Sequence, residues 1–329
     1  MNSRYNVSLP WWAWTLMGLG LAAFAALIVL SVKRNRGMKR SLFATPYVLW
    51  MIIFTVAPLI IIVYYAMTDS QGQLTMDNLR NFWDSNFLRR MSAASESAKA
   101  RYAVRGMSNI EPLTYSLWMA FLCTVICLVL AYPAALFMAD RKLKNASAVV
   151  ILFVVPMWMN ITLRTYAMRI LMVDNGPLIN FLRMIGFRNA QLMDTPTAVL
   201  IGMVYNFLPF MVFPIYTVLS KLDPALLEAA SDLGAGPRLS LIKVTMPLSI
   251  PGVVSGITMV FMPAVTTFTL NVMLGGSKRL MLGNLIEQTF TKQNNWNMGS
   301  AMSLVMMALI LLSLTILRKA DPNNEGGGL

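Results

Sequence analysis

Histidine is absent from all 329 residues of this sequence, and charged residues make up only 12% of it. Without histidine the chain lacks the commonest general base and the commonest metal ligand of proteins. The low charged fraction, set against 57% hydrophobic residues, leaves too little polar surface for a soluble domain of this length. The composition therefore indicates an integral membrane protein, and we expect neither an enzyme nor a metal site.

The sequence also has few cysteines and no phosphate-binding loop. Cys123 and Cys127 are one helical turn apart in an apolar run, which favours small packing residues over a disulfide or metal pair. The pattern G-x-x-x-x-G-K-[S/T] does not occur, and the run from Gly275 to Lys278 lacks its spacing. We therefore expect no ATP on this chain by that route, and an energy source on a partner.

The formal net charge of +13 does not indicate a nucleic-acid-binding protein. Lysine and arginine lie in short clusters between long apolar runs, whereas a nucleic-acid surface would need them along one solvated face. The clusters are typical of membrane topology, so we expect a membrane partner and no nucleic acid.

Seven apolar segments are long enough to cross a bilayer, which takes about 20 helical residues. They run from Trp11 to Val32, Leu42 to Met67, Leu113 to Ala139, Ala148 to Val173, Thr197 to Ser220, Ser249 to Leu274 and Met298 to Leu317. Open strands would leave backbone groups unpaired in lipid. The sequence therefore predicts an all-α membrane bundle.

Positive charge sets the expected orientation, because cytoplasmic loops carry an excess of lysine and arginine. The basic clusters are Lys33 to Arg40, Arg141 to Lys144, and Arg318 with Lys319. Placing them inside puts the N-terminus outside, and puts Lys221 to Met246 and the C-terminus in the cytoplasm. The loop from Asp69 to Pro112 must then be external despite six basic residues, which is tolerable because long loops follow the rule poorly.

The first apolar segment resembles a retained anchor more than a signal peptide, because it is about 22 residues long and basic residues follow it. An alternative is that translation starts at Met38. We expect residues 1–37 to form an extra anchor and basic loop, 38–320 the main transmembrane domain with a cytoplasmic loop at 221–247, and 321–329 a flexible tail.

The stretch KLDPALLEAASDLGAGPRLSLIKVTMPLSIPG, from Lys221 to Gly252, predicts two short cytoplasmic helices. Asp223 is a good N-cap, Pro224 suits a first helical turn, and Gly234 can end a helix in the left-handed conformation. We expect helices from Pro224 to Leu233 and from Pro237 to Val244, after which Met246 and Pro247 turn the chain into the membrane. Leucines and an alanine would give a partner an apolar contact: Leu226, Leu227, Ala230, Leu233, Leu239 and Leu241.

This stretch resembles the EAA loop of binding-protein-dependent ABC importer permeases. The matching residues are Glu228, Ala229, Ala230, Asp232, Gly234, Val244, Met246 and Pro247. In that family the loop forms coupling helices that sit in a cleft of the ATP-binding subunit. The resemblance implies that Glu228 is a charged anchor, that the two alanines allow close approach, and that Gly234 permits the turn.

Other runs are similar to spermidine/putrescine-type permeases. They include LAYPAALFMAD from Leu130, VPMWMNITLRTYA from Val155, LPFMVFPIYTVLSKLDPALLEAASDLGA from Leu208, PLSIPGVVSG from Pro247 and FMPAVTTFTLNVMLGG from Phe261. The resemblance implies a type I ABC importer fold, with six core helices plus one extra N-terminal helix, in a prokaryotic plasma membrane. It further implies a homologous second permease subunit, two ATP-binding subunits that carry ATP and Mg, and an extracytoplasmic substrate-binding protein.

Two departures bear on the substrate. Polyamine permeases often carry an acidic residue where this chain has Val272, and a polycation crossing lipid should favour a carboxylate. The loop from Asp69 to Pro112 is also longer than the family usually has. Another small solute therefore remains the alternative cargo.

Five residues are candidates for a substrate path: Trp158, Asn160, Arg164, Tyr166 and Tyr205. Aromatic faces bind cations, yet aromatic residues in such helices commonly just pack or anchor. Arg164 and Arg169 lie toward the outer half of a span, where a charge marks a path or reaches to the interface. For Arg164 we favour a structural or gating role in the bundle interior.

Three rival functions fit the sequence less well. A secondary transporter should place an ionisable residue or a broken-helix ion site at mid-membrane and has no use for the 221–247 loop. A membrane enzyme needs a nucleophile and a base. A scaffold would not explain similarity along nearly the whole core, so the sequence favours an importer permease.

Overall fold

The computed structural model describes residues 47–48, 50–69, 71–83, 110–140, 146–186, 191–276 and 279–319. The expected helix from Trp11 to Val32, the tail 321–329 and most of the long loop 69–112 lie outside these residues. The chain divides into two units, Met1–Tyr65 and Ala66–Leu329. Near the end of the first unit, a π-helical segment η1 (Ile52–Val56) leads into α3 (Ala57–Ala66).

The second unit holds the remaining elements, and every one of those described is helical. They are α4 (Asp77–Trp83), α7 (Ile110–Ala139), α8 (Ala146–Trp158), α9 (Ile161–Met172), α10 (Pro177–Met184), α11 (Pro196–Ser220), α12 (Pro224–Asp232), α13 (Pro237–Ser240), the π-helical η2 (Leu241–Thr245), α14 (Met246–Thr266), α15 (Thr269–Leu274), α16 (Leu282–Thr291) and α17 (Trp296–Lys319). Among the described residues, four helical stretches are long and apolar enough to cross a membrane: Ile110–Ala139, Pro196–Ser220, Pro237–Thr266 and Trp296–Leu317.

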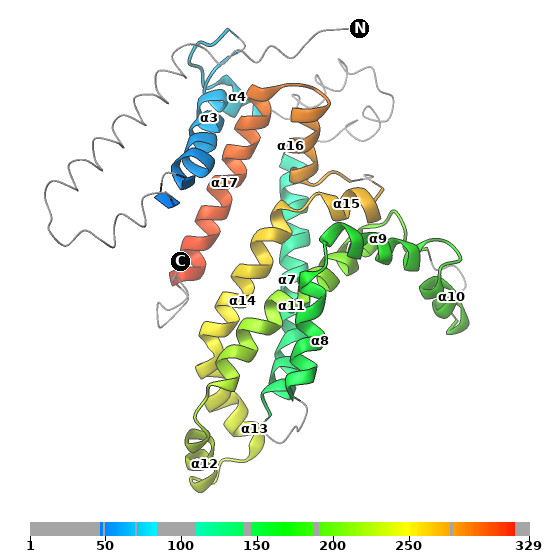
Figure 1. Cartoon of the computed structure of the whole chain (residues 1–329), viewed down its shortest axis with the longest axis vertical. Helices are drawn as coiled ribbons and strands as arrows, with labels where there is room; N and C mark the ends of the chain where they lie inside the picture. Colours follow the sequence, from blue (N-terminus) through cyan, green and yellow to red (C-terminus); the bar gives the residue numbers. More distant parts are fainter. Residues whose placement is uncertain are drawn as a thin grey trace, which may run out of the picture. The chain divides into compact units, whose positions relative to one another are not determined.

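Helices α7, α11 and α14 pack against one another and form the centre of this unit (Figure 1). The buried face of α7 includes a stripe of small residues: Ser116, Ala120, Cys123, Cys127, Ala131 and Ala135. Small side chains let helices approach closely where lipid supplies no hydrophobic drive for association. Both cysteines are fully buried and unbridged, so their expected role as packing residues is confirmed.

Two glycines on α14 set its contact with α11. A Cβ added at Gly252 would lie 2.9 Å from the carbonyl oxygen of Pro214, and one at Gly256 would lie 2.7 Å from the sulfur of Met211. At Gly252 the obstacle is a backbone oxygen, so only glycine fits there. At Gly256 the Met211 sulfur belongs to a flexible side chain, and the Met211 carbonyl oxygen at 3.2 Å also limits the room. The four-residue spacing places both glycines on one face of α14, which is the small-xxx-small arrangement of membrane helix pairs.

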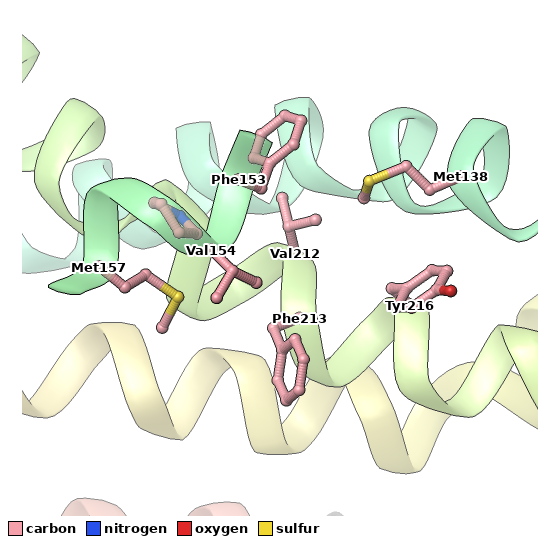
Figure 2. Close-up of a pocket in the computed structure, with 8 residues that line it drawn as sticks. Met138, Phe153, Val154, Met157, Val212, Phe213 and Tyr216 are labelled. Atoms are coloured by element: carbon pink, nitrogen blue, oxygen red, sulfur yellow. The ribbon is translucent and has the colours of Figure 1, made fainter. Parts of the chain in front are cut away.

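The apolar wedge between α7, α8 and α11 is filled by side chains. Figure 2 shows Phe153 and Met157 of α8 facing Val212 and Phe213 of α11, with Met138 of α7 nearby. The space left has a volume of about 10 Å³, which is at most the room for one water. The wedge is therefore filled by its own side chains and leaves no room for a ligand.

Two of the expected spans are broken, and both predictions of a single helix were wrong. The segment Ala148–Val173 divides where α8 ends at Trp158 and α9 begins at Ile161. Asn160 starts the new helix, because its side-chain oxygen accepts a hydrogen bond from the amide of Thr162 at 2.8 Å. The segment Ser249–Leu274 divides at Thr267, whose backbone is extended.

The second break is stabilised by two buried asparagines. Asn271 Nδ2 donates to Asn284 Oδ1 and to the carbonyl of Arg279, both at 2.8 Å. Asn284 Nδ2 donates to the carbonyl of Phe268 at 3.1 Å. A broken helix frees backbone carbonyls, and burying them unpaired would be costly. The asparagine pair adds a second donor to the carbonyl of Phe268 beside the break and one to the carbonyl of Arg279 after α15, and it ties α15 to α16.

Candidate functional site

The short helix α12 lies at one end of the α7, α11 and α14 bundle, away from α15 and α16 (Figure 1). Its start follows from local chemistry, because the side chain of Asp223 accepts a hydrogen bond from the amide of Ala225 at 3.0 Å and Pro224 occupies the first helical position. The prediction of a helix from Pro224 to Leu233 is confirmed, with the last residue acting as its cap.

The end of α12 is equally well defined. The amide of Ala235 donates to the carbonyl of Ala230 at 2.9 Å, and the amide of Gly234 donates to that of Ser231 at 2.9 Å. Gly234 has φ +80°. These paired bonds form a Schellman motif, which needs a left-handed residue where glycine sits. The motif fixes the angle at which the chain leaves α12 for α13.

The surface of this turn is apolar although it lies at an end of the bundle. Leu226, Leu227 and Leu239 are each more than two-fifths exposed, and Leu233 is 89% exposed. Glu228, Ala229, Asp232 and Pro247 are exposed as well. An exposed apolar patch rimmed by charge is typical of a docking surface. We call the exposed residues Leu226, Leu227, Glu228, Leu233 and Leu239 the coupling surface.

Two residues do not take the places expected of them. Ala230 is buried, because its face of α12 turns inward toward the rest of the helix-turn-helix. It therefore offers no surface to a partner, and the prediction that it would do so was wrong. Leu241 is only partly exposed, since it belongs to the π-helical segment that continues inward.

The second short helix does not stop at Val244, and Met246 and Pro247 make no turn; both predictions were wrong. Helical backbone continues from Pro237 through η2 to Thr266. The amide of Met246 donates to the carbonyl of Leu241, five residues back. Proline at 247 has no N–H to give and would clash with the carbonyl four residues earlier, which the wider π-helical turn accommodates.

The candidate path residues lie on α8, α9 and α11 but do not share one environment. Trp158, Tyr166 and Tyr205 are 86%, 53% and 44% exposed, and Asn160 is used as the cap of α9. Arg164 is 5% exposed, and within the described part of the chain its Nε and Nη1 have no hydrogen-bond acceptor. The structure thus places Arg164 in the interior and Arg169 on the surface.

At the other end of the unit, two adjoining cavities share Tyr115 and Arg279. One, of about 280 Å³, is also lined by Glu111, Thr114, Trp118 and Leu280. The other, of about 350 Å³, is also lined by Asp194, Pro196, Val199, Asn271 and Gly275. Sequence reasoning missed this place, because its residues come from four separate segments. Among the described residues, no group of three or more His, Cys, Asp or Glu is placed to hold a metal ion.

Comparison with known families adds a broad match. Residues 91–323 match the family described as "Binding-protein-dependent transport system inner membrane component". The chain is 40% identical over 213 residues to the "Spermidine/putrescine transport system permease protein PotB" of Salmonella typhimurium (strain LT2), covering 64% of this chain and 74% of that protein. It is 39% identical to the Escherichia coli (strain K12) protein of the same name over 213 residues, covering 64% and 78%.

A solved structure shares the fold. The chain superposes with a TM-score of 0.68 and 15% identity on a chain of a bacterial ABC transporter involved in the import of the acidic polysaccharide alginate, covering 89% of this chain and 98% of that one. At this identity the likeness speaks to the fold alone, which is that of an ABC importer transmembrane domain. The expected fold class is confirmed.

Proposed function

This chain belongs to the family of binding-protein-dependent transport system inner membrane components, and from that premise we propose that it is the permease subunit of an ATP-driven ABC importer for polyamines. The family match covers more than half of the chain and places it in the membrane as a multi-pass protein. The polyamine cargo is supported by relatives at 39–40% identity whose names specify spermidine and putrescine.

The observation that carries the coupling role is the coupling surface itself. α12 is short, capped at both ends and apolar outside, with Glu228 exposed beside Leu227. Isolated helices of this length are marginal in water, so its two capping motifs indicate a shape that is built to persist. We propose that it sits in a cleft of an ATP-binding subunit, which carries ATP and Mg.

The remaining partners follow from the same proposal. A homologous second permease subunit would complete the pathway, a second ATP-binding subunit would pair with the first, and an extracytoplasmic substrate-binding protein would deliver the cargo. In this arrangement the coupling surface and the C-terminus lie in the cytoplasm and the N-terminus outside. The cavities around Tyr115 then face the extracytoplasmic side, since they lie at the end away from α12.

The proposed mechanism is alternating access. ATP binding closes the two ATP-binding subunits and draws the two coupling surfaces together. Because α13, η2 and α14 form one uninterrupted helical stretch, movement at Leu239 passes directly to the membrane part of α14. The permease pair then opens toward a loaded binding protein, and ATP hydrolysis returns it.

Two substitutions test the coupling role in the complete transporter. Glu228→Lys reverses the charge of the coupling surface, and Gly234→Asp places a side chain where φ is +80°. We expect both variants to reach the membrane and to lose uptake, with ATP hydrolysis no longer linked to transport. Normal uptake by both would contradict the coupling assignment.

The cargo is tested separately. Proteoliposomes containing the wild-type transporter and its binding protein should take up labelled spermidine or putrescine when ATP is supplied inside. Another small solute taken up in preference, with no polyamine uptake, would overturn the polyamine part and leave the importer function standing.

A further inference from the structure

We propose that the two cavities around Tyr115 and Arg279 form a binding site for the ammonium groups of a linear aliphatic polyamine, at the end of the permease away from α12. This inference rests on the proposed function and deepens it by assigning a cargo site. Neither the coupling surface nor the residues of α8 and α9 take part in it.

The wall shared by the two cavities already holds a cation. The guanidinium carbon of Arg279 lies 5.7 Å from the centre of the Tyr115 ring. This is the distance at which a ring face attracts a positive charge. The Tyr115 ring is therefore a cation-binding surface in this structure, and an incoming ammonium would compete with Arg279 for it.

Each cavity has one carboxylate. Glu111 lines the first and Asp194 lines the second. Within the described residues, neither carboxylate receives a side-chain hydrogen bond from Arg279, whose guanidinium lies instead over the Tyr115 ring. The two carboxylates outnumber the single arginine, so the lining favours an added cation. A linear polyamine has an ammonium at each end, which matches one carboxylate in each of two adjoining cavities.

The walls of the cavities are held rigidly. Asn271 donates to the carbonyl of Arg279 at 2.8 Å, and the hydroxyl of Ser116 accepts from the amide of Leu282 at 2.8 Å. These bonds fasten the segment that carries Arg279 to α15 and α7. A site whose supporting groups are fixed loses little entropy when a ligand binds.

Asp194 is fixed in the same way. Its amide donates to the carbonyl of Leu274 at 2.9 Å, and its φ of +59° is unusual for a residue other than glycine. Its carboxylate lies so close to Gly276 that a Cβ there would clash with it. Such backbone strain persists only where the surroundings enforce it. The enforced conformation holds Asp194 in the lining of the cavity that Asn271 and Arg279 also line.

The test uses the complete transporter with its binding protein in proteoliposomes, comparing spermidine with putrescine. Glu111→Gln and Asp194→Asn should each lower the polyamine delivered per ATP hydrolysed by about threefold to fivefold, the size of a partly exposed ion pair. This loss of delivery should be larger for spermidine, a triamine, than for putrescine, a diamine. In the Arg279→Gln variant, added unlabelled polyamine should compete more strongly with the uptake of labelled polyamine, because the substitution removes the cation that competes for the Tyr115 ring.

The matched control is Asp174→Asn, which neutralises an exposed carboxylate in the α9–α10 turn outside both cavities. It should transport as wild type does. Unchanged delivery by both Glu111→Gln and Asp194→Asn, in a transporter that does import polyamines, overturns this site alone. Weaker competition by unlabelled polyamine in the Arg279→Gln variant also overturns this site, since that result indicates a site for an anion. Absence of polyamine uptake by the wild type overturns the proposed cargo together with this site.

Discussion

The hydroxyl groups of Tyr132 and Ser249 lie 2.9 Å apart and join the last third of α7 to the first turn of α14. Ser249 also donates to the carbonyl of Met246 at 2.9 Å. A serine hydroxyl has one proton to give, so the tyrosine is the donor between the two side chains. This contact fixes the first turn of α14 beside α7, next to the π-helical segment η2.

Replacing Tyr132 with phenylalanine should lower the free energy of unfolding by about 1 kcal/mol, the net worth of one hydrogen bond. The ring still packs, so the change isolates the hydroxyl. Thermal unfolding of the purified subunit in detergent measures it. In a double-mutant cycle Tyr132→Phe and Ser249→Ala should be less than additive, and full additivity would mean that the two hydroxyls do not interact.

Gly252→Ala should destabilise the bundle by roughly 1–3 kcal/mol, because the added methyl would meet the carbonyl of Pro214 at 2.9 Å. The thermal midpoint should fall, and the chain should be more easily digested by protease. Met259→Ala is the control, since Met259 lies on the exposed side of the same helix. Equal midpoints for the two variants would contradict the close crossing of α11 and α14.

Gly234→Ala and Gly236→Ala compare one substitution at two backbone conformations. Gly234 has φ +80°, whereas Gly236 has φ −68°, and nothing among the described residues lies within 4 Å of a Cβ added at either position. Only the first should be strained, by about 1 kcal/mol. Uptake should therefore fall for Gly234→Ala alone, measured with equal amounts of protein in the membrane. Equal loss in both would point to the added methyl and not to the turn.

The sequence predicted α12 well because its ends are local. Asp223, Pro224 and Gly234 each act within a few residues, so their chemistry can be read without the rest of the fold. The break between α8 and α9 was missed because Ala148–Val173 was taken as one span by its length, although the apolar run of α8 gives way to ITLRTYAMRILM, with two arginines and two threonines, in α9. Pro156 and Asn160 were the available indications, yet prolines are also common in unbroken membrane helices such as α11.

The cavities around Tyr115 illustrate a different limit. Glu111, Asp194 and Arg279 belong to segments that are far apart in the chain, and they meet only because α7 packs against the loops beside α15 and α16. No spacing rule connects such residues. The buried Asn271 and Asn284 pair is of the same kind, since Asn271 donates to Asn284 and Asn284 donates to the carbonyl of Phe268, beside a helix break that the sequence did not reveal.

Asn271→Leu should cost about 1–3 kcal/mol, because it leaves Asn284 Oδ1 and the carbonyl of Arg279 without their donor in a buried place. The thermal midpoint of the subunit should fall accordingly. Asn180→Leu is the matched control, since the side chain of Asn180 is exposed and donates one hydrogen bond, to the carbonyl of Asn175. A midpoint no lower than the control's would mean that the asparagine pair does not stabilise the break.

Pro247→Ala introduces a backbone N–H at position 247 and removes the proline ring, whose clash with the carbonyl four residues earlier the π-helical turn now relieves. An α-helical turn could then replace the π-helical one. Because the π-helical turn holds one extra residue, this change rotates α13 by about 100° relative to α14. The coupling surface would lose its alignment with a partner. We expect polyamine uptake per ATP to drop while the subunit still assembles, and an unchanged ratio would show that the π-helical turn does not depend on Pro247.

The uninterrupted helix from Pro237 to Thr266 has a mechanical consequence. Its 30 residues make a lever about 45 Å long at 1.5 Å per residue. A tilt of about 5° at one tip therefore sweeps the other tip through about 4 Å. If the stretch tilts as a rigid body about its end near Leu239, a tilt of that size therefore displaces Thr266, where the helix ends, by the same few ångströms.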